Sequence, residues 1–474
     1  MMINSDERAW AASEFGRAEL GNRLRLVRLM AMAAQVATKP GGTVTSVFAT
    51  SAEREGAFRF LENDHVDPTA MARGAHLAAA SRCAGESYAY APVDQTSLNL
   101  TDGTGRKGFG AVGRSRDRAK GLQVMTAIAV SPEGTPQGLT GQAYWSRPRG
   151  KKKKRPQDRD KQHTKDKETE RWLCVMRQTR AAFAEAAPLT KPWFQLDRGG
   201  DAWPILTEFG TGDDVWLTVR ASWDRRLWTA PGEPQRYLWE TVEREEPLGD
   251  FLLFVPERPG RTARFARMEL RACLVPLDLR DKRTGRHHRL NMWAVQAREV
   301  GTTPGKERPL EWMLLTNRPV DDVQSAQEVV FGYSQRWRIE DFHRTWKTGA
   351  CRVEESQLRD VDNLIRWAIL LSSVAMRIQR LMYLSRSQPE QPATVEFTQP
   401  EIDAVIVATR QKRYQRGDVP PVVEVVRWIA EEGGYTGKSS GGPPGATVLA
   451  RGLERLQVLF RVFTDEAATG ERKR

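Results

Sequence analysis

The order of apolar and polar residues divides the chain into helical ends and a middle region of strands. Residues 1 to about 85 and roughly the last seventy residues carry apolar side chains at helical spacing. Between them, short alternating or β-branched segments predict strands at 87–98, 122–130, 193–196, 215–220, 251–255, 266–274 and 290–297. In 266–274 every second residue is apolar, which predicts one buried and one wet face, with Leu274 on the buried face. The strands after residue 210 form either a separate sheet or an insertion.

Two capping signals mark helix starts near the N-terminus. Thr50-Ser51-Ala52-Glu53 has the spacing of a capping box, and Asp67-Pro68 fits an N-cap followed by a proline in the first turn. Further along, 172–186 and 364–384 have helical patterns. The apolar run 367–376 inside the second is far shorter than the roughly 20 residues of a membrane span, so it predicts a buried helix.

The stretch 333–347, wound as one α-helix, places two chemistries on two faces. At about 100° per residue, Tyr333, Arg336, Glu340 and Lys347 fall within a sector roughly 60° wide. The far side collects Ile339, Phe342 and Trp346. A carboxylate flanked by two cations and a phenol suits a metal-dependent enzyme that acts on phosphodiesters. Taken alone, such a stripe is more often a solvated face of mixed charge.

Two aspartates accompany predicted strands. Asp94 lies in or at the end of the first strand, and Asp197 directly follows 193–196. Each has an ordinary alternative: a turn aspartate that binds its own backbone, or an acid in a glycine-containing loop. With Glu340 they form the order sheet end, sheet end and helix, which lets three carboxylates converge on a pair of divalent cations. Such a pair activates water or a 3′ hydroxyl for attack at phosphorus.

Charge and cysteine content narrow the class of protein. The 474 residues carry a formal charge of +13, which favours a polyanionic partner such as nucleic acid. The length suggests about three domains. Four widely separated cysteines lack metal or redox spacing, which predicts buried thiols in a reducing cytoplasm. The N-terminus lacks the apolar core of a signal peptide, and the lysine-rich run 151–155 predicts a solvated loop.

The pattern Y-x2-R-x3-E-x6-K, formed by Tyr333, Arg336, Glu340 and Lys347, carries a family resemblance. The chain resembles the DDE-class bacterial insertion-sequence transposases of the Y-R-E-K signature group, and particularly their transposon-five branch. Other segments that share the resemblance are 56–60, 94–98, 197–201 and 311–316. The resemblance covers most of the chain and is thinnest in the lysine run and the C-terminal quarter.

The resemblance implies an α/β architecture. A ribonuclease-H-like mixed-sheet catalytic core with a large β insertion would stand between N-terminal and C-terminal helical domains. Residues 1–85 would bind transposon ends, 86–385 would form the core with its insertion at about 210–310, and 386–474 would dimerise. The expected partners are double-stranded transposon-end DNA, target DNA and a second copy of the chain, with no membrane.

The resemblance also implies roles for single residues. The expected catalytic acids, which would hold two Mg²⁺ or Mn²⁺ ions, are Asp94, Asp197 and Glu340. The expected DNA contacts are Tyr333, Arg336, Lys347, Trp312, Arg198 and Arg220, with Arg225 and Arg226 nearby. Among these, Asp94 would bridge the ions, Arg336 would grip a phosphate, and Trp312 would receive a flipped base.

The implied activity is cut-and-paste DNA transposition through a hairpin intermediate. A nuclease of the same fold that does not join strands, and a silent DNA-binding regulator, are the alternatives. The chain makes two departures from the family pattern: Gly199-Gly200 replaces Glu-Ala, which predicts a looser loop, and Gln95 replaces a threonine. Neither departure removes an expected metal ligand, so the sequence gives no sign of inactivity.

Overall fold

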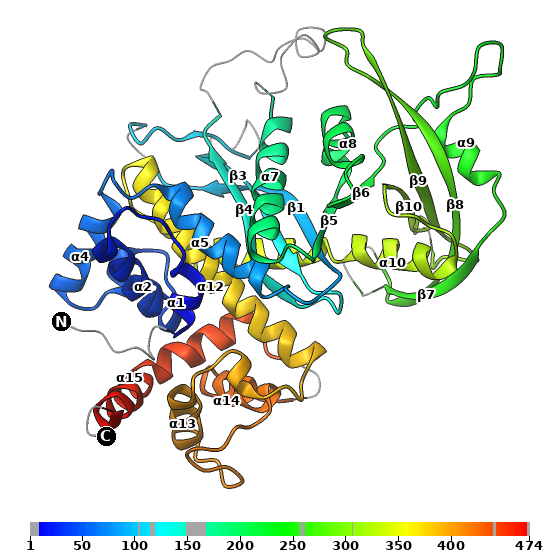
Figure 1. Ribbon diagram of the computed structural model, residues 1–474. Coiled ribbons are helices and arrows are strands. Elements are labelled where there is room, and N and C mark those ends of the chain that lie inside the picture. Colours follow the sequence, from blue (N-terminus) through cyan, green and yellow to red (C-terminus); the bar gives the residue numbers. More distant parts are fainter. Residues whose placement is uncertain are drawn as a thin grey trace.

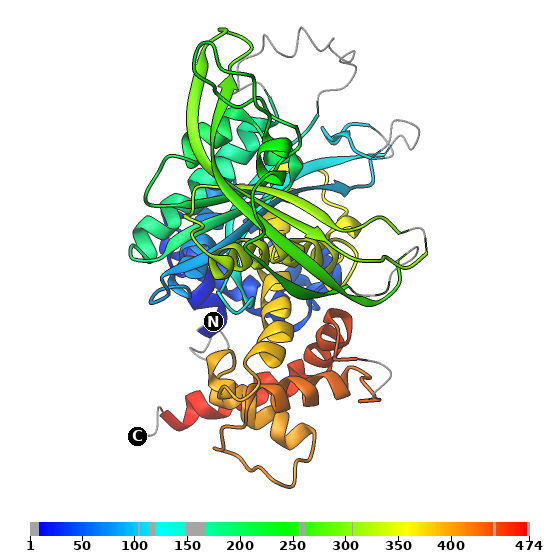
Figure 2. The same cartoon turned by 90° about the vertical axis from the view of Figure 1, so that its right-hand side faces the viewer.

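The computed structural model describes residues 9–102, 105–113, 119–147, 167–255, 257, 261–305, 307–438 and 442–471. A 10-stranded mixed sheet runs through the molecule and helices cover it (Figure 1), so the predicted α/β class is confirmed. The C-terminal helices form a lobe at the end of the molecule opposite to the tip of a long hairpin made by β8 (Arg264–Arg280) and β9 (His287–Glu299) (Figure 2).

The N-terminal part is helical, as predicted. Its helices are α1 (Ala9–Phe15), α2 (Arg23–Thr38), α3 (Val44–Val47), α4 (Ser51–Leu61) and α5 (Pro68–Ser81). The Thr50 side chain accepts from the Glu53 N–H and the Glu53 side chain accepts from the Thr50 N–H, which completes the predicted capping box. Asp67 caps α5 through the N–H of Thr69. Both predicted helix starts are confirmed.

The sheet combines parallel and antiparallel pairs. The remaining strands are β1 (Tyr88–Asn99), β2 (Gly110–Ala111), β3 (Lys120–Val130), β4 (Pro136–Trp145), β5 (Lys191–Leu196), β6 (Trp216–Arg220), β7 (Gly249–Val255) and β10 (Glu311–Thr316). Their order is β2-β3-β1-β5-β6-β10-β9-β8-β7, and β4 pairs with β3 off this path. The pairs β1–β5 and β5–β6 are parallel, whereas β1–β3 and β6–β10 are antiparallel. Strands β2, β4 and β10 are additions to the set predicted from the apolar pattern.

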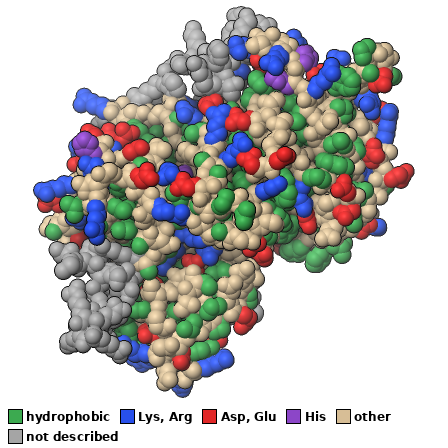
Figure 3. Space-filling view, in the orientation of Figure 1, with side chains coloured by type: hydrophobic (Ala, Val, Ile, Leu, Met, Phe, Trp, Pro, Cys, Tyr) green, Lys and Arg blue, Asp and Glu red, His purple; other side chains and the backbone are tan. Residues whose placement is uncertain are grey.

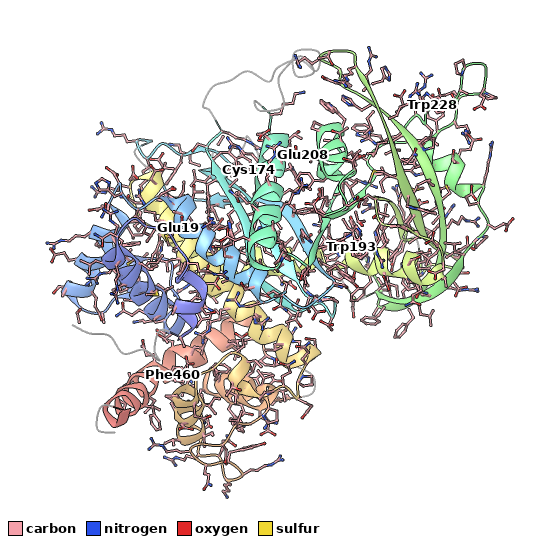
Figure 4. All side chains as sticks on the ribbon, in the orientation of Figure 1. Glu19, Cys174, Trp193, Glu208, Trp228 and Phe460 are labelled. Atoms are coloured by element: carbon pink, nitrogen blue, oxygen red, sulfur yellow. The ribbon has the colours of Figure 1, made fainter. Side chains whose placement is uncertain are left out.

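Helices pack against both faces of the sheet. They include α7 (Thr169–Ala186), α8 (Trp203–Phe209), α9 (Leu238–Glu243), α10 (Val323–Ser334) and α11 (Trp337–Lys347). Val93 of β1 belongs to the core under α7 and α8, while Tyr90 and Leu98 belong to the core that includes α10 and α11. Because strand side chains alternate between faces, Asp94 shares the α11 side. Trp193 of β5 is buried on the same side (Figure 4).

Strands β7 to β9 do not form a separate sheet. Strand β10 pairs with β6 through Leu314 and Arg220, and with β9 through Trp312 and Ala297. Strands β8 and β7 then extend the same sheet by antiparallel pairing. Of the two arrangements left open by the sequence, the separate sheet is therefore wrong.

The buried face predicted for β8 changes along the strand. Ala266, Met268 and Leu270 are buried as predicted, but Leu274 is 53% exposed. Val275 and the alternate residues after it are buried instead. The first half of β8 packs in the core on the α10 side and the second half in the core that contains α9. One 17-residue strand thus serves two cores with opposite faces, and the single alternating pattern predicted for it is wrong at Leu274.

Helix α12 (Val361–Ser387) links the N-terminal helices, the sheet and the C-terminal lobe (Figure 1). It contains the predicted helix 364–384, and its apolar run is buried. The Arg366 side chain donates to the carbonyls of Val66 and Leu61, at 2.7 Å each. The lobe consists of α13 (Gln399–Ala408), α14 (Val422–Glu432) and α15 (Ala446–Glu471). None of the helices in the described ranges has an apolar stretch that would cross a membrane.

The four cysteines are free thiols. Cys83 and Cys351 are buried as predicted, but Cys174 and Cys273 are half-buried, so the prediction of buried thiols is confirmed only in part. Cys174 projects from α7 (Figure 4). The lysine-rich run 151–155 lies outside the described residues.

Candidate active site

Asp94 and Asp197 follow residues that are register partners on parallel strands. Val93 of β1 pairs with Leu196 of β5, and each aspartate is the next residue in its chain segment. Asp94 lies inside β1, where it pairs with Thr126 of β3, while β5 ends before Asp197. Since neighbouring strands lie about 4.8 Å apart, the two acids emerge next to each other on one edge of the sheet.

Glu340, on α11, is linked to Asp94 by Arg336, which binds both carboxylates. Glu340 stands in the first turn of this helix, and Arg336 lies just before it. The Arg336 Nη1 donates to Asp94 Oδ2 at 3.0 Å, and its Nη2 donates to Glu340 Oε1 at 2.8 Å. The three buried residues Ile339, Phe342 and Trp346 hold the opposite face of α11 in the core, as predicted.

The pKa of Asp94 reports how close these charges are. Burial, as the largest cause, and the negative charges of Asp197 and Glu340 together raise the pKa of this carboxyl to about 6, against the opposing effect of Arg336. The Gln95 N–H also donates to Asp94 Oδ1 at 2.7 Å. The charges of both other predicted acids therefore act on the pKa of Asp94, which would not be so for an isolated aspartate in a turn.

The prediction of one continuous helix over 333–347 is wrong, because the helix is interrupted at Gln335 and Arg336. Helix α10 ends at Ser334 and α11 begins at Trp337. At the break the N–H of Arg336 donates to the carbonyl of Tyr333, three residues back, and such a turn is tighter than an α-helix. The break separates Tyr333 from the other three residues of the motif.

Tyr333 packs against Trp312, and the helix break stands between it and Glu340 in the chain. Only 5% of Tyr333 is exposed, and its ring meets that of Trp312 edge to face at 5.8 Å between centroids. Trp312 lies on β10 and is half-buried. The structure thus brings together the tyrosine and the tryptophan predicted to contact DNA. Tyr333 lies three residues before Arg336, at the end of α10.

Lys347, at the last turn of α11, lies over β1. Its Nζ is 3.3 Å from Thr96 Oγ1 and 3.5 Å from a carboxylate oxygen of Glu354. The same Glu354 oxygen accepts from the Asn99 N–H at 2.8 Å. Glu354 was not predicted, because the only signal for it in the sequence is an acid in a short polar segment. It fixes the ammonium group near Asp94, two residues along β1 from Thr96.

The loop after Asp197 is closed, not loosened. Gly199 donates its N–H to Asp197 Oδ1 at 2.7 Å, within a short 3₁₀ turn (Arg198–Gly200). A Cβ at Gly200 would lie 2.7 Å from Leu196 Cβ, so close packing favours glycine there. The looser loop predicted from the two glycines is therefore wrong.

Asp201 and Arg225 form a structural pair that the sequence did not reveal. The Asp201 side chain is fully buried and accepts from Arg225 Nε at 3.1 Å and from the Ser222 N–H at 2.7 Å. Arg225 is thus bound inside the protein and not placed as the DNA contact expected of it. Arg198 is exposed, and Arg220 donates to the carbonyl of Glu311 at 3.0 Å while remaining half-exposed.

The three acids suit a hard divalent cation by their chemistry, because carboxylate oxygens are the preferred ligands of Mg²⁺ and Mn²⁺. Their arrangement is not closed around an ion: within the described ranges, no three Asp, Glu, His or Cys side chains stand close enough together to hold a metal. Arg336 occupies the position between Asp94 and Glu340. Holding a metal ion there requires this guanidinium to move.

A cavity of about 470 Å³ lies elsewhere, between α5, β4, α7 and α12, with His76, Tyr144 and Cys174 in its wall. It contains none of the three acids, so it is separate from the candidate site. On the face shown in Figure 3, Lys and Arg side chains are interspersed with acids. The excess positive charge of the chain is therefore not concentrated in one patch of this face.

Comparison with known protein families adds matches at both ends of the chain. Residues 7–66 match a family described as "Transposase DNA-binding", and residues 373–469 match one described as "Transposase Tn5 dimerisation domain". The two ends of the chain are thus similar to domains that bind DNA and that pair two copies, which supports a DNA-processing protein. More particularly, both matches support a Tn5-like transposase.

Proposed function

We propose that this protein is a cut-and-paste transposase whose reactions all take place at Asp94, Asp197 and Glu340. The sequence of reactions is hydrolysis at the transposon end, attack of the freed 3′ hydroxyl on the opposite strand to form a hairpin, hairpin opening, and joining to target DNA. The catalytic region would be a ribonuclease-H-like core, with β7 to β9 as its insertion. The main support for this proposal is the register of β1 and β5, which puts Asp94 beside Asp197, next to the helix that bears Glu340.

The acids would hold two Mg²⁺ or Mn²⁺ ions, and Asp94 is in charge contact with both of the other carboxylates. Bound ions of this kind lower the pKa of water and stabilise charge on the leaving oxygen. The protein's own part is to keep the three carboxylates aligned. Strand β1, the end of β5 and helix α11 fix their positions, and the nearby cations offset their mutual repulsion.

The cations would hold the DNA strand beside the acids. Lys347 stands over β1 and Arg336 at the start of α11, so both reach the same edge of the sheet. The pair Trp312 and Tyr333 offers an aromatic surface on which an unpaired base could stack, worth about 1–3 kcal/mol per base. Arg198 and Arg220 lie next to Asp197 along the chain and along the sheet, where they would contact backbone phosphates.

The C-terminal lobe supplies a surface for a second copy. On α15, Val458 is 64% exposed and Val462 is 45% exposed, one helical turn apart. Exposed apolar residues at this spacing suit packing against a partner helix. The dimerisation-domain match covers this helix, so we place the contact between copies here.

One assay tests the proposal and separates it from its alternatives. Linear DNA that ends in the nucleotides flanking the coding sequence is incubated with the protein, Mg²⁺ and a target plasmid. Hairpins followed by integration support the transposase. Cleavage without joining would instead indicate a nuclease, and a gel shift without cleavage a DNA-binding regulator.

Variants connect the assay to the site. Asp94→Ala and Glu340→Ala should each abolish cleavage while leaving the gel shift in place, because the expected end-binding residues lie in the N-terminal helices. The control is Asp213→Ala, an exposed acid near the start of β6, away from the site. Cleavage that survives in either of the first two variants would refute the assignment of the acids.

A further inference from the structure

We infer that Arg336 couples DNA binding to metal binding, by holding Asp94 and Glu340 together until a backbone phosphate takes its guanidinium away. This inference rests on the proposed function of the acids. It concerns the state of the site before DNA arrives. The position of Arg336 between two expected metal ligands motivates it.

The guanidinium stands where a cation between the acids would stand. Two different nitrogens of Arg336 bind carboxylates that come from β1 and from the first turn of α11. Only 12% of the Arg336 side chain is exposed, so these charge-assisted bonds are largely sheltered from water. Since each bond engages an oxygen that a metal ion would need, the arginine and a bridging ion compete for the same atoms.

Arg336 is not fully satisfied in this position. Its Nε is buried and has no hydrogen-bond acceptor among the described residues, and an unpaired buried donor is costly. A phosphate offers several oxygens to a guanidinium and can bind it in a bidentate manner. Contact with a DNA strand would therefore give Arg336 a better set of acceptors than the two carboxylates do.

The consequence is an ordered assembly. Without DNA, the acids bind metal weakly because the ion must first displace Arg336. With a phosphate bound to Arg336, the carboxylates become available. Coupling of this kind is reciprocal: metal binding should also strengthen the grip of Arg336 on the DNA backbone.

The test measures Mn²⁺ binding to the DNA-free full chain, by the loss of the electron paramagnetic resonance signal of free Mn²⁺. We expect Arg336→Met to bind Mn²⁺ about tenfold or more tightly than the wild-type chain. Arg344→Met is the matched control, because Arg344 lies on the same helix and is 74% exposed, 3.3 Å from Asp341. It should bind as the wild type does. Adding Asp94→Asn to Arg336→Met should remove the gain.

The outcomes distinguish this inference from the proposed function. Equal, tight Mn²⁺ binding by wild type and Arg336→Met would overturn the coupling and leave the metal site standing. No binding by either protein would overturn the coupling and also count against the acids as metal ligands. If Arg336→Met does not fold, Arg336→Lys replaces it. Lysine keeps the charge but cannot bind two carboxylates through a planar fork, so part of the gain should remain.

Discussion

Replacing Arg366 with methionine should loosen the attachment of the N-terminal helices to α12. Arg366 is 3% exposed, and its guanidinium donates to the carbonyls of Leu61 and Val66 and to the side chain of Asn363. Leu61 is the last residue of α4, so its carbonyl belongs to the negative end of that helix. The arginine thus satisfies one backbone carbonyl at the end of α4 and one in the loop that follows it.

The size of the effect follows from these bonds. In Arg366→Met, two buried carbonyls lose their donors at about 1–3 kcal/mol each. Methionine recovers part of this loss because no charge is then buried. We expect a net loss of about 3 kcal/mol in the local stability of α4 and the loop after it.

Hydrogen exchange measures this loss directly. About 3 kcal/mol corresponds to about 150-fold faster exchange of the protected amides in 51–66. Arg386→Met, at the exposed end of the same helix, should leave that exchange unchanged. Unchanged or slower exchange in Arg366→Met would refute the reasoning, because it would mean that relief of the buried charge outweighs the two unsatisfied carbonyls.

Two further predictions concern charged groups inside the protein. Burial lowers the pKa of His343 to about 3. Between about pH 3 and 6.5 the unfolded chain therefore binds a proton at this histidine that the folded chain does not bind. The free energy of unfolding falls as the pH drops through that window. On lowering the pH from 7.5 to 5.5, the free energy of unfolding of His343→Phe, measured in urea, should therefore rise by about 1 kcal/mol relative to that of the wild type. If the free energies of the two proteins followed parallel curves against pH, this prediction would be contradicted. Asp201→Asn should cost about 3 kcal/mol because Arg225 loses its buried partner, whereas Asp214→Asn, in the exposed pair with Arg180, should cost less than about 1 kcal/mol. Equal losses in the two variants would show that burial does not govern these pairs.

Much of the fold could be predicted where strands carry alternating or β-branched apolar residues. The pattern located β1, β3, β5, β6 and β7 within a few residues. It missed β4, which is buried along most of its length and contacts α5, α7 and α12. A strand covered on both faces shows no alternation, and the glycines Gly138 and Gly141 further weaken its signal.

The identities of the site residues were also predictable, but their partners were not. Sequence order and resemblance singled out Asp94, Asp197 and Glu340, and the register of two parallel strands brings the first two together. The i,i+4 spacing is compatible with the Arg336–Glu340 pair. Neither pattern nor spacing indicates that Arg336 also binds Asp94, because that contact joins positions 242 residues apart. The break before α11 was missed for a related reason: apolar periodicity continues across it, and only the hydrogen bonds change.

Helix α12 makes the chain sensitive to length in a way that substitutions do not reveal. Its 27 residues form about 40 Å of continuous helix, which touches the N-terminal helices near its start and the C-terminal lobe near its end. One residue inserted at its middle would turn everything downstream by about 100° and advance it by about 1.5 Å. Insertions and deletions should therefore be tolerated in the loops at either end of α12 and rejected within it, whatever residue is added.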